Sequence, residues 1–269
     1  MLHAQGGASS LAPNQAVSQA DAKKTLARIY GYMAIGLAIT AVVSFVIALV
    51  FALIVGPAVM GEGATKEQIA AAENAFTVYT IVLVVSGVLL LGVTIVLSIL
   101  ARRVMLGRSS KTSVLVPYLL YAALMGVFFS AFMIAGIDFW TMAEAFGITA
   151  LVFGTMFVIG YYTKVNLSII ATTLMSLLMS LILISLLFTI LALATGKGFG
   201  AYALDMIISV VMTVYVLIIV AIDGNNIKRL IDAGQMTREL EVTFAMDMYV
   251  DFIYIFMRVL ALIVALKDN

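Results

Sequence analysis

Long runs of apolar residues, separated by short polar segments, recur along almost the whole chain. The hydrocarbon core of a bilayer is about 30 Å thick, so a helix needs about 20 apolar residues to cross it. Seven stretches meet that requirement: residues 30–56, 76–100, 113–137, 146–162, 167–193, 202–222 and 244–266. The pattern therefore predicts an all-α integral membrane protein built as a bundle of seven transmembrane helices.

Two smaller patterns refine the expected packing of these helices. The fourth stretch is short and contains Gly147, Gly154 and Gly160, so we expect it to pack closely against its neighbours, where small residues let backbones approach. Several tyrosines fit the belts that aromatic residues form at membrane interfaces: Tyr118, Tyr121, Tyr161 and Tyr162.

The first 25 residues differ from the rest of the chain. They are rich in Ala, Gln, Ser and Gly and lack the apolar core of a signal peptide. We interpret residues 1–25 as a disordered cytosolic tail and residues 26–269 as a single seven-helix transmembrane domain.

Composition excludes several functional classes. Of 269 residues, 64% are hydrophobic and 11% are charged, whereas soluble domains average about 45–50% apolar and about 25% charged residues. The net charge of +1 gives no indication of nucleic-acid binding. There is no cysteine, and the single histidine, His3, lies in the polar tail. We therefore expect no resident cofactor and no enzymatic activity, because thiol, haem and histidine-based chemistry lack their residues inside the membrane.

Charged residues between the stretches predict the orientation. Lysine and arginine are retained on the cytoplasmic side of membranes, and most of the basic residues precede the first stretch or follow every second one, whereas the alternate loops hold only Lys66 and Lys197. The residues that precede the first stretch or follow every second one are Lys23, Lys24, Arg28, Arg102, Arg103, Arg108, Lys111, Lys164, Lys228, Arg229 and Arg238. The pattern predicts a multi-pass protein with a cytoplasmic N-terminus and, if the seventh stretch spans fully, an external C-terminus.

Ionisable residues inside the apolar stretches are the main candidates for function, because such groups cost several kcal/mol at membrane depth unless paired or hydrated. Asp223 closes the sixth stretch. Asp247, Asp251 and Arg258 lie within the seventh, roughly on one helical face. By helical rise, Asp251 lies about 10 Å below the cytoplasmic end of its helix.

If the sixth and seventh helices are neighbours, Asp223 and Asp251 can face each other. Two adjacent carboxylates in a low dielectric resist double ionisation, so one would hold a proton and the pair could sense pH. Without that proton the pair could bind a divalent cation such as Ca²⁺. Arg102 or Arg103 could act as a counter-ion. A purely structural role for both aspartates stays open. Asp223 precedes Gly224 at an expected helix end and could be solvated, and Asp251 could be satisfied by a helix-capping contact or by an arginine.

Several segments, in this order and spacing, resemble the Bax inhibitor (TMBIM) family of membrane proteins, especially its bacterial members, over roughly Ala27 to the C-terminus. The matching segments are residues 29–41, 117–126 with Ser130, 145–150 with Phe153, 160–164, 221–223 with 227–228, and 248–256. Two departures are Leu90-Leu91-Gly92, where some members carry a glutamate, and Asn166, where the family has an acidic residue.

The resemblance implies a seven-helix bundle with the last helix near its centre, located in the bacterial inner (plasma) membrane. It also implies a pH-sensitive cation leak, chiefly for calcium, governed by an aspartate pair. That pair falls on Asp223 and Asp251, and the family's arginine at the end of the second span falls on Arg102.

Two other functions remain open. Some bacterial relatives look like modulators of an FtsH-type membrane AAA protease, and the polar tail could serve such a partner. Two aspartates on consecutive helices also occur in intramembrane aspartyl proteases, but Met248-Tyr249-Val250 stands where those enzymes have Gly-x-Gly. The sequence leaves the oligomeric state open.

Overall fold

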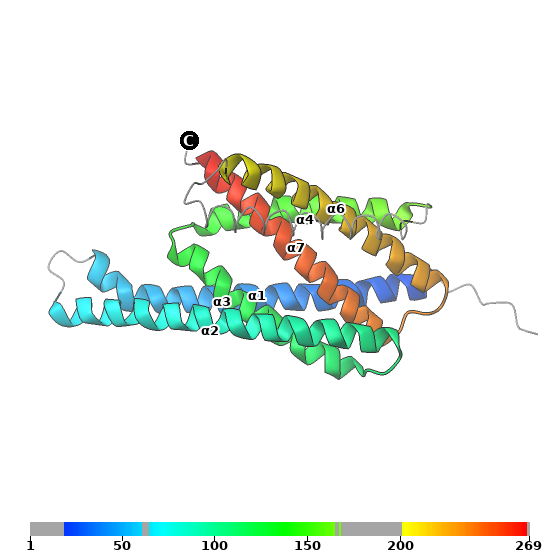
Figure 1. Ribbon diagram of the computed structural model, residues 1–269, viewed down its shortest axis with the longest axis horizontal. Coiled ribbons are helices and arrows are strands. Elements are labelled where there is room, and N and C mark those ends of the chain that lie inside the picture. The colour runs from blue at the N-terminus through cyan, green and yellow to red at the C-terminus, as the bar shows by residue number, and fades with distance from the viewer. Residues whose placement is uncertain (1–18, 61–64, 165–166, 168–200, 268–269) are drawn as a thin grey trace, which may run out of the picture.

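The computed structural model describes residues 19–60, 65–164, 167 and 201–267, and its regular elements there are all α-helices (Figure 1). They are α1 (Gln19–Met60), α2 (Lys66–Met105), α3 (Lys111–Ile134), α4 (Phe139–Tyr162), α6 (Ala201–Asp232) and α7 (Arg238–Lys267). Within the described residues, 6 helices are long and apolar enough to cross a membrane. The fifth expected span, residues 167–193, falls almost wholly outside them, so the seven-helix count stays a prediction.

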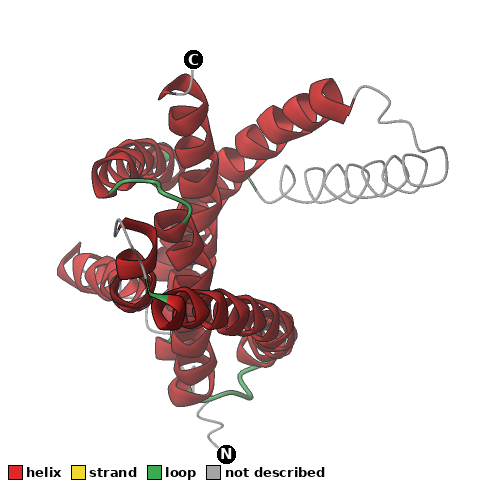
Figure 2. Cartoon of the chain, turned by 90° about the vertical axis from the view of Figure 1, so that its left-hand side faces the viewer, coloured by secondary structure: helices red, strands yellow, loops and turns green. Residues whose placement is uncertain are grey.

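The described helices form two layers with α7 between them. Helices α1, α2 and α3 pack together as one layer, and α4 packs against α6 as the other. Helix α7 crosses diagonally from one layer to the other and contacts each of the other described helices. Seen from the side, the described part is helical with only short loops between helices (Figure 2).

The first two helices are longer than the expected spans. Helix α1 has 42 residues and α2 has 40, so each extends about 60 Å at 1.5 Å per residue. Residues 19–25, which we expected in the polar tail, form the first turns of α1. Helix α2 begins ten residues before the expected span because Thr65 and Gln68 form a reciprocal capping box.

Helix α6 does not end at Asp223, which corrects the expectation that this aspartate lies at a helix terminus. The helix continues to Asp232. The polar run after Asp223 is tolerated because it packs on the end of α4. Gly224 lies against the backbone of Phe157, and the buried Asn225 side chain donates a 3.0 Å hydrogen bond to the carbonyl of Thr163.

Asp138 caps the start of α4, seven residues before the expected span. Its carboxylate accepts hydrogen bonds from the backbone N–H groups of Trp140 (3.1 Å) and Thr141 (3.2 Å) and from the Thr141 hydroxyl. The Thr141 hydroxyl bond, followed by the backbone bond from the same residue, lowers the pKa of Asp138. The cap is therefore complete when Asp138 is ionised and weakens as the pH falls through its lowered pKa.

A buried polar junction joins α1, α3 and α7. The hydroxyls of Thr40 and Tyr249 lie 2.6 Å apart, and Thr40 also donates to the carbonyl of Ala122 at 2.9 Å. The Tyr118 hydroxyl donates to the carbonyl of Tyr32 at 3.0 Å and is seated over Gly36. Tyr118 is fully buried, so its predicted place in an interfacial belt is wrong.

Basic residues gather at one end of the bundle. Helices α1, α3 and α7 begin at this end and α2, α4 and α6 finish there, on the right in Figure 1. Contacts between distant segments establish this arrangement: Arg28 pairs with Glu241, and the Lys111 ammonium lies 5.0 Å from the centre of the Tyr32 ring. Most of the 15 lysines and arginines lie at this end of the bundle, as the positive-inside pattern predicts.

The three glycines of α4 have different environments. A Cβ on Gly160 would lie 1.9 Å from the carbonyl oxygen of Ala221 on α6. Among the residues that the structure describes, Gly147 and Gly154 have nothing within 4 Å of that position. The expected close packing is therefore confirmed for Gly160 and stays a prediction for the other two.

We predict that Gly160→Ala destabilises the protein by about 1–3 kcal/mol, because the added methyl group forces α4 away from the α6 backbone. Gly154→Ala is the matched control on the same helix. It should be neutral or stabilising by up to about 1 kcal/mol, because alanine favours the helix. Thermal unfolding of the purified protein in detergent measures both changes, and equal melting temperatures for the two variants would contradict the assigned α4–α6 contact.

Candidate functional site

Three aspartates meet between α6 and α7. Asp223 lies on α6, while Asp247 and Asp251 lie one turn apart on α7, and a short loop, residues 233–237, makes the two helices antiparallel neighbours. The Asp251 carboxyl group lies within electrostatic reach of Asp223 and Asp247, and Asp223 lies within reach of Asp247. The Tyr215 hydroxyl on α6 lies within electrostatic reach of Asp223 and Asp251. The structure thus brings the predicted pair together and adds Asp247 to it.

This cluster lies in apolar surroundings. The residues beside it include buried Ile222, Met248 and Phe252, and the Oδ2 atom of Asp251 is buried with no hydrogen-bond partner among the described residues. The ion pairs in the described part of the chain join Arg28 and Arg238 to Glu241 and Lys267 to Glu144. None of these three pairs includes a clustered aspartate. A lone carboxylate charge here costs several kcal/mol, so the site favours uptake of a proton or a cation.

The aspartates do not form a ready-made metal cage. Among the residues that the structure describes, no group of three or more carboxylate or imidazole side chains could hold a metal ion. Calcium ordinarily takes six to eight oxygen ligands. Calcium binding near Asp223 and Asp251 therefore stays a prediction.

The arginines named from the sequence lie elsewhere. Arg102 and Arg103 are exposed at the end of α2, which belongs to the layer opposite α6. Arg258 donates to the Tyr254 hydroxyl at 3.3 Å, with its guanidinium 5.2 Å from the centre of the Tyr254 ring. The counter-ion role of Arg102 stays a prediction, and it would require α2 to approach α6.

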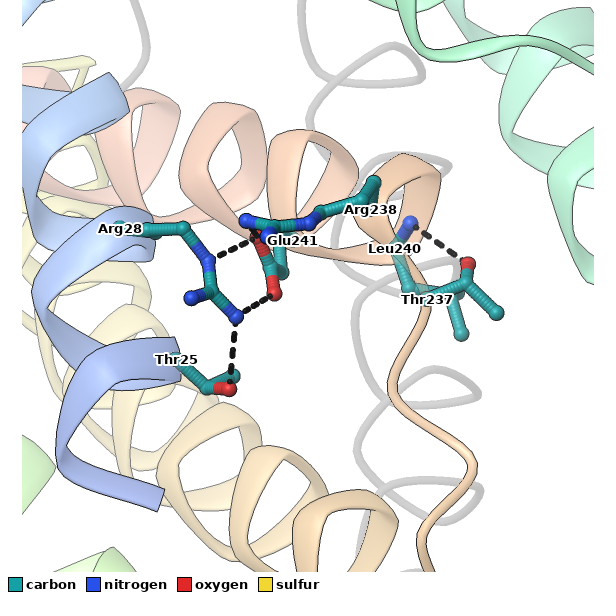
Figure 3. Close-up of polar contacts among 6 residues, drawn as sticks. All are labelled: Thr25, Arg28, Thr237, Arg238, Leu240 and Glu241. Carbon is teal, nitrogen blue, oxygen red and sulfur yellow. Dashed lines mark hydrogen bonds and ion pairs between the residues drawn. The ribbon is translucent and has the colours of Figure 1, made fainter. Parts of the chain in front are cut away.

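Sequence reasoning missed a buried ion pair at the basic end of the bundle (Figure 3). The Arg28 guanidinium donates two hydrogen bonds to the Glu241 carboxylate, from Nε to Oε2 at 2.8 Å and from Nη2 to Oε1 at 2.6 Å. Arg28 Nη2 also donates to the Thr25 hydroxyl at 3.0 Å. Arg238, on the first turn of α7, makes a longer 3.4 Å contact with Glu241.

This ion pair fixes the start of α7 against the start of α1. The Glu241 side chain is 2% exposed, whereas those of Arg28 and Arg238 are 32% and 56% exposed. Glu241 lies almost three helical turns before Asp251, so the pair anchors the helix that carries two of the clustered aspartates. The only sequence signal was a glutamate beside the apolar run that starts at Val242, and its partner lies 213 residues away.

Comparison with known proteins gives a family match over most of the chain. A family model described as "Inhibitor of apoptosis-promoting Bax1" (Bax1-I) matches residues 22–269. An uncharacterized membrane protein of Streptococcus pyogenes serotype M3 is 32% identical over 155 residues, which cover 57% of this chain and 64% of that protein. A serotype M6 relative is 31% identical with the same coverage. The matched region thus spans somewhat less than two thirds of those relatives' length.

We predict that Glu241→Gln lowers the free energy of unfolding by about 1–3 kcal/mol, because half-buried Arg28 loses its charged acceptor. Arg238→Gln is the control at the same cluster. Its exposed side chain and longer contact predict a loss below about 1 kcal/mol. Denaturant titration in detergent compares them, and a larger loss in Arg238→Gln would show that Arg28 is not the main partner of Glu241.

Proposed function

The chain belongs to the Bax inhibitor family, and from that premise we propose that it is a pH-sensitive cation leak, chiefly for calcium, governed by Asp223 and Asp251. The observation that carries the proposal is the Oδ2 atom of Asp251, which is buried beside Asp223 and Asp247 and has no hydrogen-bond donor among the described residues. The free energy of a carboxylate in that position depends strongly on whether it is ionised and on whether the neighbouring carboxylates are ionised.

The proposed mechanism is repulsion between α6 and α7. At acid pH a shared proton on the Asp223–Asp251 pair lets the two helices pack closely, and flux is low. As the pH rises and both carboxylates ionise, like charges repel across the α6–α7 contact, and Asp247 adds to that repulsion. The loosened contact admits a cation, which neutralises the charge as it passes, and weak binding lets it leave again. In the closed state, Arg102 would add an ion pair to Asp223.

Helix directions support a seventh span. The end of α4 packs against α6 near Asn225, and both helices finish at the basic end. Two neighbouring helices that run in the same direction need one crossing between them, which favours the expected span at residues 167–193. We propose that α7 lies near the centre of the resulting seven-helix bundle. The basic end then faces the cytoplasm with the N-terminus, and the membrane is the bacterial inner (plasma) membrane.

We propose no catalytic role. Aspartyl proteolysis requires two carboxylates that share a water against the substrate, and Met248-Tyr249-Val250 before Asp251 does not provide the glycine-bearing backbone of those enzymes.

A second candidate function is regulation of an FtsH-type membrane AAA protease. One observation favours it: α1 starts at Gln19, and its first turns expose Lys23 and Lys24 at the basic end. A helical, cationic extension at that end is suited to contact a cytosolic partner.

We predict that calcium flux into proteoliposomes rises between about pH 5 and pH 8 and that Asp251→Asn removes this response. Asparagine mimics the protonated carboxyl group, so flux in the variant should stay low at every pH. Asp223→Asn should behave similarly, because it removes the other half of the repulsion. A calcium dye trapped inside the vesicles measures the flux.

Asp232→Asn is the matched control, because Asp232 is an exposed aspartate on α6, further along the helix than Asp223. It should keep the wild-type pH profile. If Asp251→Asn retains the pH response, the carboxylate mechanism is wrong. If neither the wild type nor any variant conducts cations above empty liposomes, regulation of the protease becomes the favoured hypothesis. Co-purification of the FtsH-type protease with the protein, with and without residues 1–25, tests that hypothesis.

A further inference from the structure

An apolar groove separates the two layers on the half of the bundle away from the basic end. It has a volume of about 330 Å³ and is bounded by α1, α3, α4 and α7. Buried aromatic and aliphatic side chains form its floor: Phe129 from α3 and Phe252, Ile253 and Phe256 from α7. The groove therefore lies where the α1–α3 side and the α4 side meet over α7.

The mouth of the groove is open to the outside of the bundle. Phe45 on α1 and Phe139 and Phe146 on α4 line it and are 52%, 62% and 46% exposed. The small, exposed side chains of Ala41 on α1 and Ala143 on α4 also line the groove. Because α1 and α4 are membrane-spanning helices, this mouth is continuous with the surface that contacts the lipid bilayer.

The described lining residues offer little to water. Thr40 and Ser44 are the polar side chains among them, and both have partners. Thr40 bonds to Tyr249 and to the Ala122 carbonyl, while Ser44 donates to the Met133 sulfur at 3.9 Å. A water molecule needs two to four polar partners, and an apolar cavity without them stays dry. At this depth the available apolar molecules are lipid chains.

We propose that this groove is a binding site for one acyl chain of a membrane phospholipid, which enters between Ala41 and Ala143 and lies on Phe129 and Phe252. Three features support this occupant: the apolar lining, a volume within the range of small-molecule sites, and continuity with the lipid-facing surface. The proposal does not depend on cation flux. The bound acyl chain would nevertheless contact α7 directly beside Asp251, because Phe252 and Ile253 form part of the floor.

Photo-crosslinking of the full-length protein in vesicles tests the site. The vesicles contain phosphatidylglycerol and phosphatidylethanolamine with a trace of phosphatidylglycerol that carries a diazirine in its acyl chain. After illumination, peptide mass spectrometry locates the adducts. We expect adducts on the floor residues Phe129, Phe252 and Phe256 as well as on the outward face of α2, where Val88 and Leu91 are each 67% exposed.

A matched pair of variants separates a groove lipid from the surrounding bilayer. Ala41→Leu/Ala143→Leu narrows the mouth and should reduce the floor adducts several-fold without changing those on α2. Ala38→Leu/Ala150→Leu adds the same side chains to exposed positions of α1 and α4 that do not line the groove, and it should leave both sets unchanged.

Either of two results would overturn the proposal. Labelling of α2 without the floor in the wild type would mean that the groove is closed to lipid or filled by protein, such as another segment or a second copy. Floor labelling that persists in Ala41→Leu/Ala143→Leu would mean that the label does not enter through this mouth. Gel filtration and circular dichroism of both variants verify that they fold.

Discussion

The low dielectric inside the bundle determines how α7 can be accommodated, because this helix brings Glu241, Asp247 and Asp251 into contact with its neighbours. A buried carboxylate must be paired, protonated or accompanied by a cation. Glu241 is paired, through a two-bond contact with Arg28. Asp251 has no such partner among the described residues. One helix thus contains a carboxylate that is neutralised by an arginine and, under the proposed mechanism, another whose neutralisation changes with pH.

The remaining contacts of α7 hold it between two layers that, among the described helices, have few other contacts with each other. On one side the Tyr249–Thr40 hydrogen bond ties it to α1, and on the other Phe252 packs against Phe146 and Phe153 of α4. The α4–α6 layer is itself compact because Gly160 lets the two backbones touch. Movement is therefore expected at the contacts of α7, where the aspartate cluster and the apolar groove both lie.

This arrangement connects the two proposals physically. Ionisation of the aspartates would act on the face of α7 toward α6, and a lipid chain in the groove would act on the face toward α1, α3 and α4. Both faces belong to a helix anchored at its start by Arg28. Because α7 is anchored at its start, the rest of the helix is the part whose position would respond to aspartate charge on one side and to a bound lipid chain on the other.

The sequence by itself determined the membrane class and five of the expected spans, which lie within longer helices. It also determined the gathering of basic residues at one end and the candidate residues Asp223 and Asp251. Each of these features depends on local composition and helical spacing. Only the tertiary structure decided that α6 continues past Asp223, that Gly160 meets the backbone of Ala221, and that Arg28 pairs with Glu241. These outcomes depend on which groups other helices present, and partners as far as 213 residues away leave no pattern along the chain.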